Sequence, residues 1–148
     1  MKIKEIMSKD IIYTDYNSSL KEAAILMLKN DIGFLPVKKD KKIIGCLTDR
    51  DITIYGIAND EKNVRDIMKN VLITIDENNN IIEAIKLMKT FKIRRLIVKS
   101  NKKISGIISI SDIINSCKEK DIIDMLKSIL RIDKNHQEYL FSVKDFEL

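Results

Sequence analysis

Gly45-Cys46-Leu47-Thr48-Asp49-Arg50-Asp51-Ile52 is matched 61 residues later by Gly106-Ile107-Ile108-Ser109-Ile110-Ser111-Asp112-Ile113. In each copy an apolar run leads from a glycine to a hydroxyl residue, and an aspartate follows three positions later. The two copies also agree outside this stretch, at Ile6-Met7 and Ile67-Met68, Glu22-Ala23 and Glu83-Ala84, and Val37-Lys38 and Val98-Lys99. Such repeats usually mean that neither unit buries its apolar face alone. We therefore expect two subdomains packed about a pseudo-two-fold axis, with one single-residue slip between Thr14 and Thr74.

Both copies have the pattern of a β-α-β-β-α unit, so the fold class is α/β (α+β). Apolar residues at helical spacing predict helices over 19–30 and 80–91, and Ser19 with Glu22 has the spacing of a capping box. The other expected elements are helical turns at 3–7 and 64–68, strands at 11–14, 34–38, 43–47, 72–75, 95–99 and 104–108, and helices that begin at Asp49 and Ile110. The polar turns at 39–42 and 100–103 predict hairpins with turns slightly longer than two residues.

These patterns divide the chain into three parts. Residues 1–60 form the first repeat, residues 61–118 form the second, and Gly56–Asn63 is the linker between them. Residues 119–148 are a C-terminal helical tail, in which Asp121–Arg131 has one apolar face at helical spacing. That face must pack on the domain, on a second subunit or on another part of a longer protein.

The composition is that of one globular domain. The 148 residues are 45% hydrophobic and 33% charged. No apolar run approaches the roughly 20 residues needed to cross a bilayer, and Met1–Ile6 lacks the apolar core of a signal peptide, so we expect no membrane association and a cytoplasmic location. Cys46 and Cys117 are not equivalent positions and are expected to be free thiols. With His136 as the single histidine, a metal site built from Cys and His is not expected.

The positive charge is concentrated in the second repeat. The net charge is +1 for residues 1–63, +6 for residues 64–118 and −2 for residues 119–148. This charge would favour an anionic ligand, although a solvated lysine-rich surface explains most of it equally well. The adjacent Arg94 and Arg95 are the cations most suited to a specific role.

The chemistry of Thr48-x-x-Asp51 is that of a cap or of a binding site. The spacing is first of all that of a capping box. Its recurrence at the same place in both repeats, after a buried strand and at the start of a helix, favours a second role, because phosphates bind readily at such positions. The Thr48 hydroxyl can donate to a phosphate oxygen, and the Asp51 carboxylate can accept from adjacent ribose hydroxyls. No nucleophile with an adjacent base accompanies the motif, so we expect a binding site and not an enzyme.

The repeated motifs resemble a tandem pair of CBS domains, also called a Bateman module, over residues 1 to about 117. The resemblance rests on Ile6-Met7-Ser8, on Asp31–Val37 and Ile43–Ile52, and on Ile67-Met68, Lys92–Val98 and Gly106–Ile113 in the second copy. It implies a ligand of the AMP, ADP or ATP class, or S-adenosylmethionine, bound between the repeats. It also implies further association into homodimers. The adenine nucleotide would be a regulatory ligand, and no cofactor is required.

The resemblance also assigns residues to two sites. The aspartates would hold the ribose and the hydroxyl residues would meet the phosphate, which gives Thr48 and Asp51 for one site and Ser109 and Asp112 for the other. Arg50 lies inside the first motif and is included with these candidates. The segments that would clasp the base contribute Ile11, Gly33, Phe34 and Pro36 from the first repeat, and Leu72, Arg94, Arg95 and Ile97 from the second. Because Ile97 stands where the first repeat has Pro36, the second copy departs from the family pattern.

The two sites are expected to differ in charge. By resemblance, Arg94 and Arg95 would reach the ligand held by Thr48 and Asp51, whereas Gly33 and Phe34 would offer no charge to a ligand at Ser109 and Asp112. We therefore expect the first site to prefer a charged nucleotide, and the second to be weak, vacant or suited to a less anionic adenosine compound.

The expected function is regulation through a separate, unidentified protein partner. A ligand-free dimerisation scaffold is the main alternative, in which both motifs are only caps. Nucleic-acid binding through the basic second repeat is disfavoured, because aromatic residues make up 5% of the chain and no reading motif is present.

Overall fold

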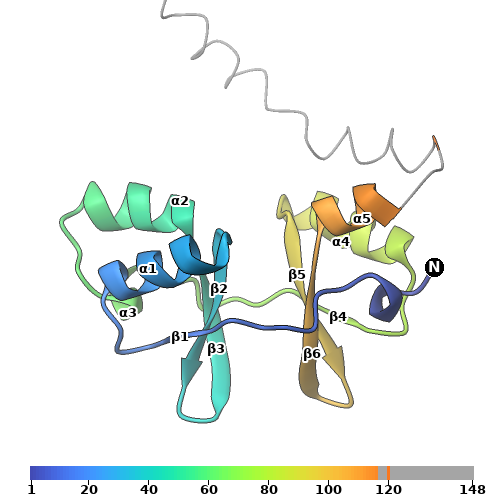
Figure 1. The fold of residues 1–148 in the computed structure, drawn as a ribbon, viewed down its shortest axis with the longest axis horizontal. Helices are drawn as coiled ribbons and strands as arrows, with labels where there is room; N and C mark the ends of the chain where they lie inside the picture. Colours follow the sequence, from blue (N-terminus) through green and yellow to red (C-terminus); the bar gives the residue numbers. More distant parts are fainter. Residues whose placement is uncertain (117–119, 121–148) are drawn as a thin grey trace, which may run out of the picture.

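The computed structural model describes residues 1–116 and 120, and in this range the chain forms two three-stranded sheets flanked by helices (Figure 1). The first half contains β1 (Thr14–Asp15), α1 (Leu20–Asn30), β2 (Phe34–Lys39), β3 (Lys42–Thr48), α2 (Asp49–Asp51) and the π-helical turn η2 (Ile52–Ile57). The second half contains β4 (Thr74–Asp76), α4 (Ile81–Phe91), β5 (Arg95–Ser100), β6 (Lys103–Ser109) and α5 (Ile110–Ser116). The short helices η1 (Ile3–Glu5) and α3 (Val64–Ile67) precede the two halves. The predicted β-α-β-β-α order is confirmed in both.

The two sheets have the same topology and the same register. In each sheet a parallel pair is followed by an antiparallel hairpin, in the orders β1-β2-β3 and β4-β5-β6. Thr14 pairs with Val37, and Ile75 pairs with Val98, so the pairing repeats at a constant offset of 61 residues. The single-residue slip expected from the match of Thr14 with Thr74 is therefore wrong. Thr14 stands where the second half has Ile75, which leaves its hydroxyl buried and, among residues 1–116 and 120, without a hydrogen-bond partner.

The hairpin turns are tighter than the sequence predicted. Lys39 pairs with Lys42, and Ser100 pairs with Lys103, so each turn contains two residues. Asn101 and Lys102 both have positive φ, as a type I′ turn requires. The predicted longer turns are therefore wrong, because turn chemistry alone did not reveal which flanking lysines belong to the strands.

A proline explains why the first strand of the first half is shorter than its counterpart. Ile97 donates its backbone N–H to the carbonyl of Ile73 (3.3 Å), which extends the β4–β5 pairing to Thr74. Pro36 occupies the equivalent position and has no N–H to donate. Strand β1 consequently begins at Thr14, and the strand predicted from Ile11 is wrong at that end.

The two long helices follow the predicted apolar spacing. Helix α1 buries Leu20, Ala23 and Met27, and α4 buries Ile81, Ala84, Ile85 and Met88. Ser19 caps α1 by accepting from the Glu22 N–H (3.1 Å), and Glu22 accepts from the Ser19 N–H in return (2.7 Å). That backbone N–H, with the Ser19 hydroxyl, lowers the pKa of Glu22 below its usual value. The predicted capping box is confirmed.

The linker between the repeats is shorter than predicted. Gly56 and Ile57 belong to η2, and Gly56 is buried. A Cβ at Gly56 would lie 2.5 Å from Cδ1 of Leu20. The absence of a side chain at Gly56 therefore lets η2 pack closely on α1. The connection to α3 begins only after Ile57.

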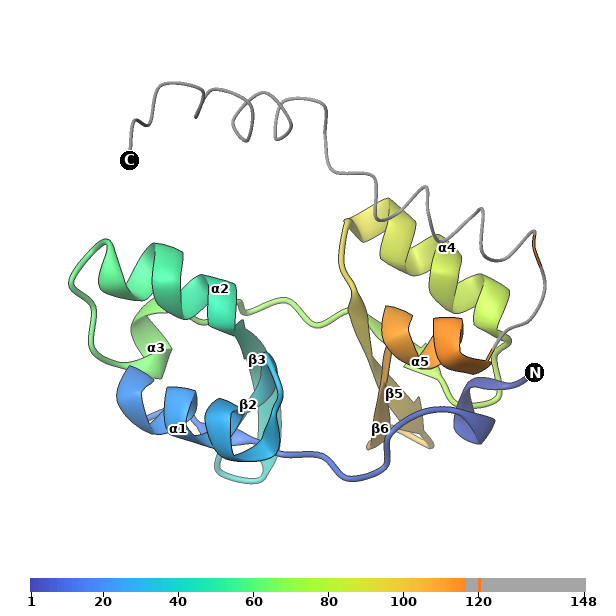
Figure 2. The same cartoon turned by 45° about the horizontal axis from the view of Figure 1, so that its top comes forward.

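The N-terminal segment of each repeat packs in the half formed by the other repeat (Figures 1 and 2). Ile3 of η1 is fully buried in the core of the second half, beside Ile75 and Ile85. Val64 and Ile67 of α3 are buried in the core of the first half, beside Leu20 and Leu47. Each repeat therefore supplies apolar residues to the core of the other, as expected for units that relate by a pseudo-two-fold axis.

Glycines allow the exchanged segments to cross the sheets. Ser8 exchanges two backbone hydrogen bonds with Ile107 of β6 (both 2.9 Å), and Lys69 exchanges two with Cys46 of β3 (both 2.9 Å). A Cβ on Gly106 would lie 2.6 Å from the Ser8 carbonyl oxygen, and one on Gly45 would clash with the carbonyl oxygen of Lys69. The crossing explains why the repeat has a glycine at this position in both copies.

The structure bears on two further expectations. Within residues 1–116 and at residue 120, no helix is long and apolar enough to cross a membrane. The helix predicted over 121–131, and the tail to residue 148, lie outside the described residues.

Replacing Gly45 by alanine should destabilise the protein by about 1–3 kcal/mol, because the new methyl group meets backbone that cannot move alone. Urea unfolding measures the change. Gly33→Ala is the matched control: the three atoms nearest its Cβ belong to the exposed Asp49 side chain, which can rotate away, so a change within about 0.5 kcal/mol is expected. Equal losses in the two variants would contradict the crossing explanation.

Replacing Thr14 by valine should stabilise the protein by about 1 kcal/mol, because it removes a buried hydroxyl that has no partner and keeps the side-chain shape. Thermal and urea unfolding measure the gain. Thr90→Val, at an exposed position of α4, controls for the substitution itself. A loss of stability in Thr14→Val would show that the hydroxyl has a partner.

Candidate functional site

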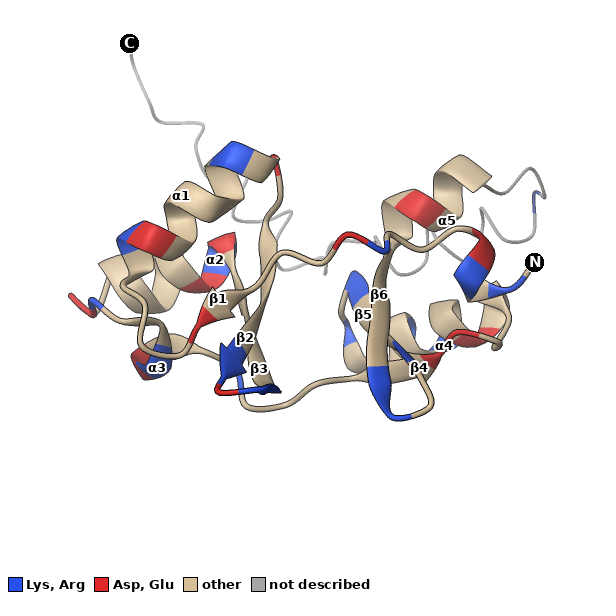
Figure 3. Ribbon diagram, turned by 60° about the horizontal axis from the view of Figure 1, so that its bottom comes forward, with Lys and Arg blue, Asp and Glu red and all other residues tan. Residues whose placement is uncertain are grey.

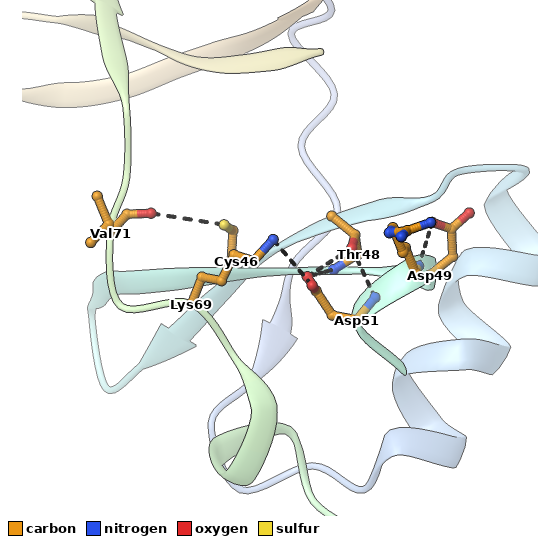
Figure 4. A network of polar contacts seen from close by, with 7 residues as sticks. Cys46, Thr48, Asp49, Asp51, Lys69 and Val71 are labelled. Carbon is orange, nitrogen blue, oxygen red and sulfur yellow. Dashed lines mark hydrogen bonds and ion pairs between the residues drawn. The ribbon is translucent and has the colours of Figure 1, made fainter. Parts of the chain in front are cut away.

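The first hydroxyl-x-x-aspartate motif lies where β3 ends and α2 begins (Figure 4). Asp51 accepts two hydrogen bonds at Oδ2, from the Thr48 N–H (3.0 Å) and from the Thr48 hydroxyl (2.7 Å). Thr48 Oγ1 in turn accepts from the Asp51 N–H (3.1 Å). The geometry is a complete capping box, and the Thr48 hydroxyl hydrogen is directed to Asp51 in this structure.

The other oxygen of Asp51 contacts a lysine from the second repeat. Nζ of Lys69 lies 3.1 Å from Oδ1 of Asp51. Asp51 is 1% exposed, whereas the Lys69 side chain is 58% exposed. The lysine reaches the carboxylate because its backbone is fixed on β3 by the bonds to Cys46. The carboxylate that a ribose would need is therefore covered by a cation that has room to move.

The second motif has the same cap without a lysine. Asp112 Oδ2 accepts from the Ser109 N–H (2.7 Å) and hydroxyl (2.6 Å), and Ser109 Oγ accepts from the Asp112 N–H (3.2 Å). The residue equivalent to Lys69 is Ser8, which crosses β6 in the same way. Among the described residues no cation lies within ion-pair distance of Asp112, which is half-buried.

The residues that open the two hairpins lie beside the motif of their own repeat. Phe34 pairs with Thr48, and the Asp49 N–H donates to the Gly33 carbonyl (3.2 Å). In the second repeat, Arg95 pairs with Ser109, and the Ile110 N–H donates to the Arg94 carbonyl (3.0 Å). Arg94 is exposed and Arg95 is half-buried. Within the described part of the chain, neither arginine forms an ion pair with Asp51, so their expected reach to the first site stays a prediction.

The remaining candidates lie on the strands and on the segments that cross between the halves. Pro36 pairs with Cys46, Ile97 pairs with Ile107, and both Pro36 and Ile97 are buried. Ile11 and Leu72 are half-buried and follow the crossings at Ser8 and Lys69. Each crossing segment thus brings one of these residues to the region between the two sheets.

Two open hollows lie beside the first motif. One, of about 390 Å³, is lined by Tyr55, Asn59, Glu61, Asp66, Ile67, Met68 and Lys69. The other, of about 380 Å³, is lined by Asp49, Arg50, Thr53 and Ile54. Lys69 lines the first hollow, and Asp49 and Arg50 line the second, whereas Thr48 and Asp51 line neither.

Cys46 lies at the crossing, next to Lys69. Its thiol is 3.9 Å from the Val71 carbonyl oxygen, and burial raises its pKa above the usual value, with a smaller opposing effect of the Lys69 charge. The thiol is therefore a protonated structural group at neutral pH, in agreement with the expectation for Cys46.

The described groups offer carboxylate and hydroxyl contacts at both motifs and an ammonium contact at the first, which suit a ligand with hydroxyl and anionic groups. Clusters of three or more His, Cys, Asp or Glu residues that could hold a metal do not occur in residues 1–116. The sequence did not single out Lys69. The alignment of the repeats held the signal, since the position after Met7 and Met68 changes from serine to lysine.

Comparison with known proteins decides the family. A family model described as CBS domain matches residues 3–57 and again residues 64–119. The chain belongs to the CBS domain family. The resemblance expected from the motifs is thus confirmed, and each match spans one copy of the repeat.

Relatives share most of this CBS pair. The protein YlbB of Bacillus subtilis is 32% identical over 117 residues, which cover 76% of this chain and 79% of YlbB. Hypoxic response protein 1 of Mycobacterium tuberculosis is 30% identical over 131 residues, covering 85% and 92% of the two chains. The crystal structure of the CBS domain pair of protein MJ0100, in complex with 5′-methylthioadenosine and S-adenosyl-L-methionine, has a TM-score of 0.73 at 28% identity and covers 78% of this chain and 94% of that one.

Replacing Thr48 by alanine should cost about 1–2 kcal/mol of stability, because the cap of α2 is lost and the buried Asp51 carboxylate loses a donor. Urea unfolding measures the loss. Thr48→Ser keeps the hydroxyl, as Ser109 does in the other repeat, and should stay within about 0.5 kcal/mol of the natural protein. A loss in Thr48→Ser as large as in Thr48→Ala would mean that the methyl group, not the cap, supplies the stability.

Proposed function

We propose that this CBS pair is a regulatory module that binds an adenine nucleotide of the AMP, ADP or ATP class, or a related adenosyl compound, between its two repeats. Ligand binding would shift the packing of the repeats, and a separate protein partner would respond to the shift. The module acts by binding and not by catalysis, and the nucleotide is its regulatory ligand.

The observation that carries the proposal is the placement of Asp51 and Asp112 at equivalent positions, each with one carboxylate oxygen held by the cap. Oδ2 accepts both cap bonds in each motif, so Oδ1 keeps lone pairs for a ribose hydroxyl. The crystallised pair of MJ0100, which is similar to this chain, is in complex with two adenosyl compounds. Together these findings support the adenosyl class over other ligands with hydroxyl groups.

In the proposed sites, Thr48 and Asp51 hold one ligand, and Ser109 and Asp112 hold the other. The residues that clasp the bases are those of the crossing segments and hairpin openings, namely Ile11, Gly33, Phe34, Pro36, Leu72, Arg94, Arg95 and Ile97. The cap hydroxyls now donate to the aspartates, so each would rotate to reach a phosphate. The first site, with Arg50 beside it, is proposed to take the more anionic ligand.

A ligand-free dimerisation scaffold is the second candidate, and exposed apolar side chains favour it. Leu28 on α1 is 81% exposed, and Ile57 on η2 is 73% exposed. Figure 1 shows α1, α2, α4 and α5 on the side of the molecule opposite the hairpin turns, and Figure 3 shows lysines at those turns. A nucleotide-binding module could form the same homodimer, so the scaffold is distinguished by the absence of ligand binding.

Asp51→Ala should weaken AMP or ATP binding about tenfold or more, because a buried acceptor for the ribose is lost. Isothermal titration measures the affinity. Asp51→Asn removes the charge of this carboxylate but keeps the side-chain size. The control is Asp40→Asn, which removes a carboxylate from an exposed hairpin turn and should bind as the natural protein does. Unchanged affinity in both folded Asp51 variants would overturn the assignment of this residue.

A thermal-shift panel of adenosine, 5′-methylthioadenosine, S-adenosylmethionine, AMP, ADP and ATP separates the two candidates. A ligand at a hundred times its Kd should add about 2.7 kcal/mol of stability. Stabilisation by at least one compound supports the sensor. No stabilisation by any of them, with a dimer in sedimentation equilibrium, supports the scaffold.

A further inference from the structure

We propose that Lys69 makes the first site selective for phosphorylated nucleotides, by covering Asp51 in the unliganded protein and pairing with the ligand's phosphate when ribose takes its place. The inference rests on the proposed function and adds a specificity-determining residue to it. Its starting point is the ion pair between Lys69 Nζ and Asp51 Oδ1.

The Asp51 carboxylate is buried, and its ion pair with Lys69 occupies the oxygen that the cap leaves free. Asp51 is 1% exposed, and both hydrogen bonds at Oδ2 come from Thr48 of its own cap. Oδ1 is the oxygen left for a ligand, and Lys69 lies against it (Figure 4). A ribose that approaches Oδ1 must therefore displace the ammonium group or share the oxygen with it.

Displacement favours a ligand that carries its own anion. The Asp51 carboxylate is buried and the Lys69 side chain is exposed, so water screens their attraction only in part. A nucleoside without phosphate would break this contact and offer Lys69 nothing in exchange. A nucleotide would offer its phosphate, and the Lys69 side chain, which is 58% exposed on a flexible stem, has the freedom to turn toward it.

The backbone keeps Lys69 at this place whatever its side chain does. The Lys69 N–H donates to the Cys46 carbonyl, and the Cys46 N–H donates to the Lys69 carbonyl, both at 2.9 Å. Gly45 leaves room for that carbonyl. Movement of the ammonium group therefore requires only side-chain rotation and leaves the crossing intact.

The second site, at Ser109 and Asp112, provides a natural comparison. Ser8 makes the same pair of backbone bonds, with Ile107, but its side chain is short and uncharged. In the described residues Asp112 has no cationic partner and is half-buried. Within this part of the chain no cation beside Asp112 rewards a phosphate, so the second site would accept an adenosyl compound without phosphate at a smaller disadvantage.

The test measures AMP and adenosine affinities at one site at a time. Asp112→Ala leaves only the first site. In that background AMP should bind about tenfold or more tightly than adenosine, because only AMP offers Lys69 a charged partner in exchange for the Asp51 carboxylate. Adding Lys69→Ser should reduce that preference several-fold, leaving the part that Thr48 and Arg50 contribute. It should also reduce the salt dependence of AMP binding. Lys41→Ser, at an exposed hairpin turn, is the control and should leave the ratio unchanged.

The reverse exchange tests the second site independently of any effect of Lys69 on folding. With Asp51→Ala as background, Ser8→Lys should make the second site prefer AMP over adenosine by several-fold. With Asp112→Ala as background, Lys69→Gln should repeat the result of Lys69→Ser at the first site. An unchanged AMP-to-adenosine ratio in the folded Lys69 variants, while Asp51→Ala weakens binding at the first site in the Asp112→Ala background, would overturn the role of Lys69 and leave the proposed function standing. If the natural protein binds neither compound, the role of Lys69 and the proposed function fail together.

Discussion

The arrangement of the two halves depends on two pairs of backbone hydrogen bonds, one at each place where the chain crosses from one half to the other. Ser8 bonds to Ile107, and Lys69 bonds to Cys46, so each repeat is joined to the sheet of the other. The apolar residues next to these crossings, Ile3 and Ile67, complete the two cores. A repeat by itself would lack part of its core, which is the physical reason for the exchange. The two halves therefore stabilise one another.

The same crossings determine which residues lie over the strands that end at the two motifs. Lys69 is placed against Asp51 because its backbone passes over β3, and only a glycine at position 45 leaves room for it. In the other half, Ser8 passes over β6 beside Gly106. Equivalent backbone crossings thus carry a lysine that contacts Asp51 in one half and a serine in the other. A difference of one side chain is enough to give two equivalent sites different electrostatic character, since the Asp51 carboxylate lies out of water.

Several features were predictable because they depend on near neighbours in the chain. The capping boxes at Ser19 and Glu22, and at Thr48 and Asp51, join residues three positions apart, so spacing alone revealed them. The helices and hairpins followed from apolar periodicity, and the family followed from motifs in a fixed order. Predictions failed where pairing partners set the outcome: strand β1 is shortened at Pro36, and the apparent slip at Thr14 disappears once the partner strand fixes the register.

The sequence by itself determined that the chain is a doubled β-α-β-β-α unit of the CBS family with a hydroxyl-x-x-aspartate motif in each copy, because those signals lie within short stretches. Only the tertiary structure decided which residues meet across the repeats. Lys69 and Asp51 belong to different copies, and their contact exists because the chain crosses from one half to the other. Sequence spacing carries no information about such a crossing, whereas the backbone bonds between Lys69 and Cys46 fix it within hydrogen-bond distance.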